Sequence, residues 1–148
     1  MIVISHSSEN RSILASCGLD LYEDEVIKDV PETLAVVQIV SSTHVRPVVS
    51  ISKGLPNAIE ELSRRWHQEA KGNRLASEQG KFLLMPAGEG ATSRGWFCVK
   101  DSCGEDLPAR LLKANGSVEF IGMSLDGERV CAVSEEDDEY WIVVENLD

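Results

Sequence analysis

The sequence has few basic residues for its acidity. Lys and Arg number 14 against 25 Asp and Glu in 148 residues, and the formal net charge is -11. Nucleic-acid backbones and anionic membrane surfaces are both held through Lys and Arg. The balance therefore argues against direct binding of either, and it favours partners that carry positive charge.

Long apolar runs are also lacking. The longest pure runs, such as Leu34–Val37 and Trp141–Val144, have the length of a strand, whereas a membrane-spanning helix needs about 20 apolar residues. The first five residues carry no basic leader and are too short for a signal-peptide core. We therefore expect a cytoplasmic protein whose four cysteines are reduced rather than paired in two disulfides.

Internal repeats and low-complexity linkers are absent as well. A chain of 148 residues has the length of one ordinary domain, because domains cluster at about 100–150 residues. It is long enough to bury a substantial core. We predict a single domain over residues 1–148.

The first third of the chain favours short elements. The pattern predicts strands at Met1–Ile4, Leu34–Val40 and Val45–Ile51, because these runs are rich in β-branched residues. A short helix is expected over Ser7–Cys17, which Gly18 would end. The segment Leu21–Val30, which Pro31 would end, is ambiguous.

The clearest helix signal covers Asn57–Lys71. Ile59, Leu62 and Trp66 recur at helical spacing and form one apolar stripe. Asn57 and the glutamate three residues later have the spacing of a capping box. Gly72 suits the position after the helix. We predict one main helix, at about residues 57–71, that packs on a sheet.

From Lys81 onward the pattern favours strands. Phe82–Met85 and Trp96–Val99 are strand-sized runs, and a meander is expected after them. Asn115-Gly116 and Asp126-Gly127 are typical of tight hairpin turns within that meander. Its four predicted strands are Leu107–Ala114, Ser117–Ser124, Arg129–Ser134 and Tyr140–Val144. The predicted class is α+β, with a largely antiparallel sheet and a C-terminal β-meander.

Motifs for nucleotide chemistry fail on inspection. Gly90 and Gly95 have the spacing of a phosphate loop, but Trp96 and Phe97 follow where Lys and Ser or Thr are required. The sequence contains no Gly-x-Ser-x-Gly elbow. These absences favour a non-enzymatic protein that needs no cofactor.

Two cysteines and one histidine keep a second interpretation open. Cys98 and Cys103 lie near the spacing of a zinc-ligand pair, and His67 is one of several isolated residues that would have to complete the site. The alternative prediction is a small enzyme or zinc-binding domain that uses these three residues. The simpler interpretation of Cys98 is a small buried apolar side chain.

The acidity is concentrated at the two ends of the chain. Residues 1–32 hold two basic and seven acidic residues, and residues 114–148 hold one basic and ten acidic. The central segment, by contrast, holds eleven basic and eight acidic residues. The charge therefore marks places on the chain rather than its whole surface.

The densest acidic run lies between the last two predicted strands. It comprises Glu135, Glu136, Asp137, Asp138 and Glu139, and Tyr140 and Trp141 follow directly. One interpretation is a solvated hairpin turn, as most charge runs are. The other is a docking surface, because carboxylates steer a cationic protein and aromatic side chains anchor it. Glu23, Asp24 and Glu25 form a smaller acidic run of the same kind.

In size, acidity and these exposed acidic runs, the chain resembles the immunity proteins of bacterial toxin systems. The resemblance implies a stoichiometric inhibitor that neutralises a basic partner, such as a nuclease-type toxin, through Glu135–Glu139, Tyr140 and Trp141, and secondarily Glu23–Glu25. An acidic DNA-mimic protein directed against a defence system would share the same features. We predict protein binding rather than catalysis.

Overall fold

The computed structural model describes residues 11–22, 30–42, 44–87, 95–102 and 104–147. Within these ranges seven strands form one antiparallel sheet, in the order β1-β4-β3-β5-β6-β7-β2. The strands are β1 (Leu19–Leu21), β2 (Val49–Ser52), β3 (Lys81–Pro86), β4 (Phe97–Asp101), β5 (Phe120–Met123), β6 (Arg129–Glu135) and β7 (Glu139–Asn146). The predicted α+β class with an antiparallel sheet is confirmed.

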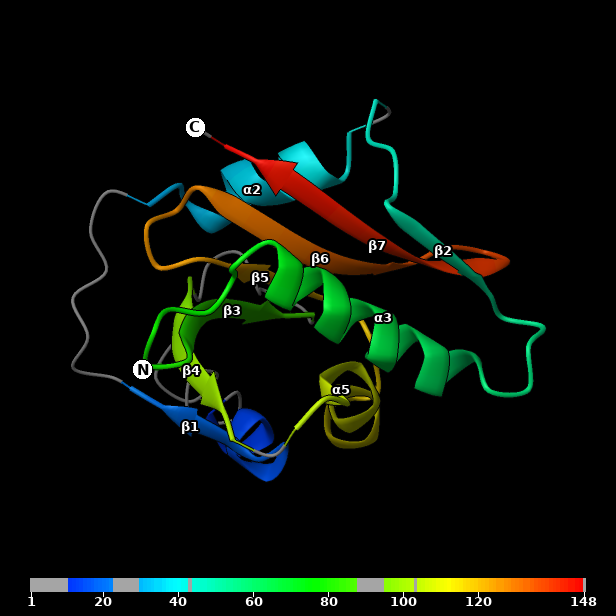
Figure 1. The fold of residues 1–148 in the computed structure, drawn as a ribbon, viewed down its shortest axis with the longest axis horizontal. Helices are drawn as coiled ribbons and strands as arrows, with labels where there is room; N and C mark the ends of the chain where they lie inside the picture. Colours follow the sequence, from blue (N-terminus) through cyan, green and yellow to red (C-terminus); the bar gives the residue numbers. More distant parts are fainter. Residues whose placement is uncertain (1–10, 23–29, 43, 88–94, 103, 148) are drawn as a thin grey trace, which may run out of the picture.

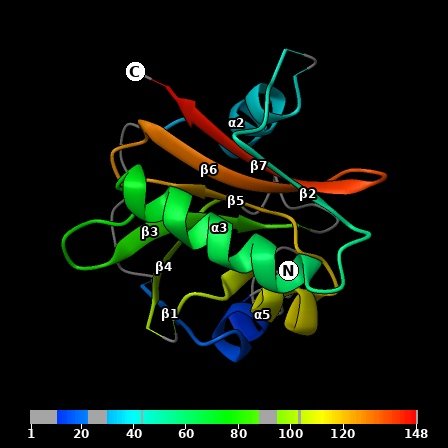
Figure 2. The same ribbon diagram turned by 45° about the vertical axis from the view of Figure 1, so that its right-hand side comes forward.

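Helices cover both faces of the sheet. α2 (Thr33–Val40) lies on one face, and α3 (Ala58–Gly72) and α5 (Leu107–Asn115) lie on the other, as Figure 1 and the turned view in Figure 2 show. Residues 11–16 form a further helical turn on the α3 side. The sheet thus separates two hydrophobic clusters, one under α3 and α5 and one under α2.

The predicted main helix is confirmed as α3. Trp66 is buried, and its indole N–H donates to the Cys131 carbonyl at 3.3 Å. Its ring meets the Phe120 ring edge-on at 5.0 Å between centroids. The capping box is wrong, because the Asn57 side chain makes no capping hydrogen bond. At the other end, Gly72 was expected to follow the helix, but it is the last helical residue and Asn73 is the C-terminal cap.

Two predicted strands are helices in the structure. Leu34–Val40 lies in α2, where Val36 is fully buried against the sheet. Leu107–Ala114 lies in α5, which begins with Pro108 in its first turn and buries Leu107 and Leu111 one turn apart. The strand propensity of the β-branched residues in α2 is weak, and burial of one helix face overrides it. In α5 the Leu, Ala, Arg and Lys residues are strong helix formers, so local propensity agrees with the helix.

The predicted hairpin turn at Asn115-Gly116 is wrong because the segment that precedes it is a helix and not a strand. Gly116 has a φ of 79° and ends α5 as its C-terminal cap. Glycine adopts this left-handed conformation without the steric cost that a Cβ brings. The turn at Asp126-Gly127 does join β5 to β6 as predicted, and Gly127 has a φ of 75°.

The remaining strand predictions hold with shifts of a few residues at their ends. β3 and β4 match Phe82–Met85 and Trp96–Val99, and the last three strands of the meander match β5, β6 and β7. Val45–Ile51 is a strand only in its second half, as β2. Met1–Ile4 and the start of the helix predicted from Ser7 lie outside the described residues.

Candidate functional site

The acidic run forms the turn of the β6–β7 hairpin. Glu135 pairs with Tyr140 at the end of the ladder, and the Glu136 N–H donates to the Glu139 carbonyl at 2.8 Å to close the turn. Asp137 and Asp138 are exposed at the tip. The turn projects from the sheet at the side opposite β1 (Figure 1). We call Glu135–Glu139 the acidic hairpin.

Strand alternation divides this hairpin between the two faces of the sheet. Tyr140 packs against the α3 cluster, whereas Trp141 packs against the α2 cluster. On the α3 side the Lys53 ammonium lies 2.8 Å from the Glu135 carboxylate and 5.3 Å from the centre of the Tyr140 ring. The hydrogen bond to Glu135 raises the pKa of Lys53. Both Glu135 and Tyr140 therefore already contact Lys53 within the molecule.

On the α2 side the hairpin presents carboxylates beside Trp141. The Ser134 hydroxyl donates to Glu136, and the Trp141 indole N–H donates to Glu139. Glu119, which precedes β5, accepts the Glu135 N–H at 2.9 Å. These hydrogen bonds hold three carboxylates at one end of the sheet. Each carboxylate retains lone pairs for further donors, because an ionised carboxyl group accepts at about four positions.

A groove of about 640 Å³ opens on the same face. Its floor is a row of directly opposed residues across four strands, because Met85 pairs with Ile121, Ile121 with Ala132, and Ala132 with Val143. Each of these residues lines the groove. The small Ala132 side chain sits between two larger neighbours, which leaves the floor hollow at its centre. We call this feature the groove.

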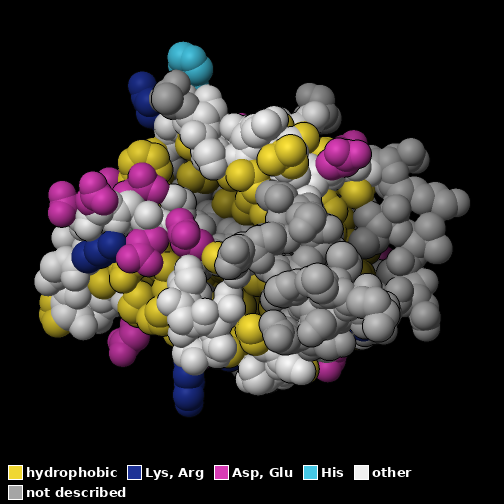
Figure 3. Space-filling model, turned by 180° about the vertical axis from the view of Figure 1, so that it is seen from behind, with side chains coloured by type: hydrophobic (Ala, Val, Ile, Leu, Met, Phe, Trp, Pro, Cys, Tyr) yellow, Lys and Arg dark blue, Asp and Glu magenta, His cyan; other side chains and the backbone are white. Residues whose placement is uncertain are grey.

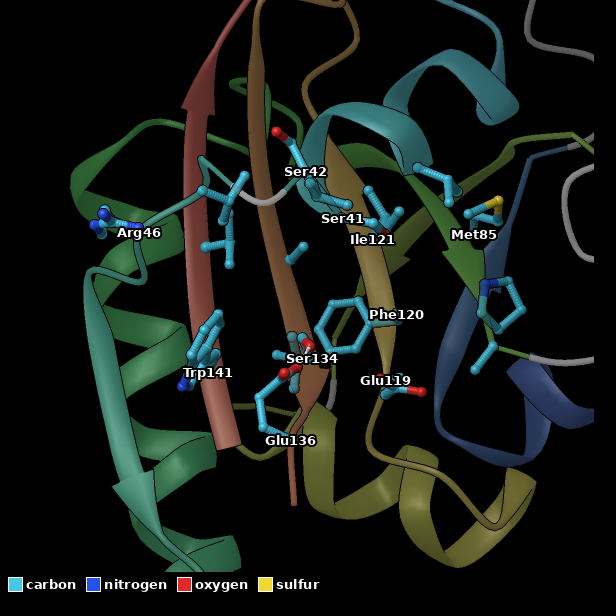
Figure 4. A pocket seen from close by; sticks show the side chains of 18 residues that line it. Ser41, Ser42, Arg46, Met85, Glu119, Phe120, Ile121, Ser134, Glu136 and Trp141 are labelled. Atoms are coloured by element: carbon cyan, nitrogen blue, oxygen red, sulfur yellow. Dashed lines mark hydrogen bonds between the residues drawn. The ribbon is translucent and has the colours of Figure 1, made fainter. Parts of the chain in front are cut away.

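The groove has an apolar wall and polar residues at both ends, and Arg46 also lines it (Figure 4). α2 and the segment after it supply Val37, Val40 and Val45 to the wall, and Ser41 and Ser42 lie at the end near α2. Glu119, Ser134 and Glu136 gather at the opposite end, beside the acidic hairpin. Figure 3 shows a cluster of carboxylates at the left of this face, beside apolar side chains, and another carboxylate at the upper right.

Of the residues proposed for zinc or enzyme chemistry, Cys98 and His67 do not come together. Cys98 is buried in the α2 cluster, whereas His67 lies on α3 at the other face, 3.6 Å from the Glu105 carboxylate. Cys103 lies outside the described residues. Within the described ranges, no group of three or more His, Cys, Asp or Glu side chains is arranged to hold a metal ion.

Glu23, Asp24 and Glu25 lie outside the described residues. Over the part of the chain that the structure describes, no helix has both the length and the apolar character needed to cross a membrane.

Comparison with protein-family models, with curated proteins and with solved structures gives no match.

Sequence reasoning found the acidic hairpin and Trp141 but missed Glu119 and the groove. The groove draws its floor from four strands and its wall from α2, a segment that the sequence pattern assigns to a strand. Glu119 is separated from the hairpin by sixteen positions, and only the β5–β6 register brings it to the Glu135 N–H. No local pattern in the sequence carries that information.

Proposed function

We propose that this chain is a cytoplasmic immunity or inhibitory protein that binds a basic protein partner, a nuclease-type toxin domain, in a stoichiometric complex. The observation that supports this most strongly is the placement of the acidic hairpin. Its carboxylates project at one edge of the sheet, with the exposed Asp137 and Asp138 at the tip. Such a concentration of charge raises the rate at which a cationic protein meets the correct surface.

The aromatic residue beside the hairpin supports the same function. Trp141 lines the groove and is partly exposed. Tryptophan is enriched among the residues that dominate binding energy in protein interfaces, since it buries a large area at a small entropic cost. Charge would set the rate of association, and contacts at Trp141 would slow dissociation.

The proposal is tested by neutralising the hairpin. The variant carries E135Q, E136Q, D137N, D138N and E139Q, and the matched control carries E32Q, E60Q, E78Q, E105Q and E128Q at five exposed glutamates elsewhere. Both variants remove five negative charges. Any difference between them therefore reports the position of the charge and not its amount.

The chain and both variants serve as bait, and the retained proteins are identified by mass spectrometry. We expect the wild type and the control to retain the same basic protein and the hairpin variant to lose it. Association with that protein should slow by about tenfold or more in the hairpin variant at low salt. Equal retention and equal association rates for all three baits would show that the hairpin is only a solvated turn.

A further inference from the structure

The groove has the properties of a site for an apolar side chain. Its volume of about 640 Å³ falls in the range of about 300–1,000 Å³ found for ligand sites. Its floor consists of the Met85, Ile121, Ala132 and Val143 row, and its wall is formed by valines of α2 and the following segment. An apolar group seated there would be removed from water without displacing polar groups from the floor.

Polar groups line both ends of the groove, and those at the hairpin end are negative, whereas Ser41 and Ser42 lie at the end near α2 and Arg46 also lines the groove. By the β5–β6–β7 register, Glu119, Ser134 and Trp141 form the next row on this face toward the hairpin. Glu136 follows, held by the Ser134 hydroxyl. Beyond it lie the exposed Asp137 and Asp138. The surface thus passes from apolar to acidic along the strand direction over three successive rows.

We propose that the groove receives a single apolar side chain of the basic partner, with flanking lysines or arginines of the same segment on Glu119, Glu136 and the hairpin tip. This inference rests on the proposed function and names the part of the partner that the site recognises. Charge complementarity favours this occupant. A segment with basic residues beside an apolar one matches the order of apolar and acidic rows, because the basic residues meet the acidic end while the apolar one enters the groove. A neutral ligand would leave the acidic end unused.

Three five-residue peptides serve as probes of the unmodified chain. They are Lys-Lys-Leu-Lys-Lys, the same peptide with glycine in place of leucine, and Ser-Ser-Leu-Ser-Ser. The readout is nuclear magnetic resonance. The methyl groups of Met85, Ile121 and Val143 report the groove, and the amides of Asp137 and Asp138 report the hairpin.

We expect the leucine-containing basic peptide to shift both groups of signals with one common Kd. The glycine peptide should shift the hairpin amides alone and bind at least tenfold more weakly, because it buries no leucine. The neutral peptide should also bind about tenfold more weakly, since it forms no charge-assisted hydrogen bonds.

The failures of the two proposals are distinguishable. If the basic leucine peptide shifts the hairpin amides and leaves the methyl groups unmoved, the groove inference is overturned and the proposed function stands. If the neutral peptide shifts the methyl groups as strongly as the basic one and the hairpin amides never move, both are overturned, and the groove serves an uncharged ligand.

Two variants fill the groove from opposite sides. Ala132→Leu adds volume at the centre of the floor, and Ser41→Trp adds it at an exposed position near the end of α2. Each should reduce the affinity for the basic leucine peptide to that for the glycine peptide and leave the glycine peptide unaffected. If Ala132→Leu disturbs the fold, Ser41→Trp still tests the site. Unchanged leucine-peptide binding by natively folded Ser41→Trp would overturn the inference.

Discussion

Trp66 is the side chain through which α3 is anchored to the sheet, and its removal is the sharpest test of the fold. The residue is 4% exposed, donates a hydrogen bond to the Cys131 carbonyl and packs edge-on against Phe120. Truncation of a buried aromatic residue to alanine typically costs about 3–5 kcal/mol, through lost transfer free energy and the cavity that remains. That is a large share of the roughly 5–15 kcal/mol by which domains are stable.

We therefore expect Trp66→Ala to lower the free energy of unfolding by about 4 kcal/mol. Trp66→Phe should cost about 1–2 kcal/mol, because it keeps an aromatic ring in the site and loses the indole hydrogen bond. Urea titrations followed by far-ultraviolet circular dichroism measure both values, and an unchanged m-value shows that the same surface is exposed on unfolding.

Gln68→Ala is the matched control, since Gln68 lies on the same helix but is exposed. Its effect should stay within about 0.5 kcal/mol of zero. A loss below about 2 kcal/mol for Trp66→Ala would refute the reasoning, as would a control that costs as much. Either result would mean that burial of this side chain does not hold α3 on the sheet.

Three further outcomes are expected. A Cβ at Gly127 would lie 2.9 Å from the Pro31 ring at a φ of 75°, so Gly127→Ala should cost about 2 kcal/mol in urea titrations, and a neutral effect would contradict the tight approach. The hydrogen bond from the Ser124 hydroxyl lowers the pKa of Asp126. The ionised Asp126 carboxylate therefore stabilises the folded state above about pH 4, and this stabilisation is lost as the pH falls through the folded-state pKa of Asp126. Asp126→Asn should flatten the pH dependence of the unfolding free energy in that acidic window, and an unaltered profile would show that this carboxyl group contributes nothing. Burial raises the pKa of the Cys131 thiol to about 12, so iodoacetamide at pH 8 should label Cys131 in urea but not in the native protein, whereas equal labelling would mean that the site opens readily.

Segments with a single strong pattern were predicted correctly. The α3 stripe repeats at the helical period, and its buried face follows from that period wherever the helix packs. The Asp126-Gly127 turn requires a residue that tolerates positive φ, and glycine supplies it locally. The acidic hairpin could be predicted because five adjacent carboxylates are difficult to place anywhere but in a solvent-facing turn.

Two segments predicted as strands are helices, for different reasons. Leu34–Val40 is rich in β-branched residues, and their strand preference is worth only a few tenths of a kcal/mol per residue. Burial of Val36 against the sheet outweighs it. For α5 a local signal existed, because Pro108 suits the first turn of a helix and argues against the interior of a strand.

Part of the candidate site could be predicted from the sequence, and part of it required the tertiary structure. The acidic hairpin and Trp141 are adjacent in the chain, so composition and spacing alone identify them. The separation of Tyr140 and Trp141 onto the two faces of the sheet follows from the two-residue period of the strand once the strand pairing is known. Tyr140 then belongs with Lys53 on the α3 side, and Trp141 belongs with the groove.

Charge, approximate strand positions, the main helix and the acidic turn could be read along the chain, because each depends on residues close to one another in the sequence. Strand order, the assignment of α2 and α5, the approach of Glu119 to the hairpin and the existence of the groove depended on the tertiary structure. The physical reason is that the groove is a gap between segments distant in sequence, and its hollow is set by which small residue, here Ala132, comes to lie between larger ones.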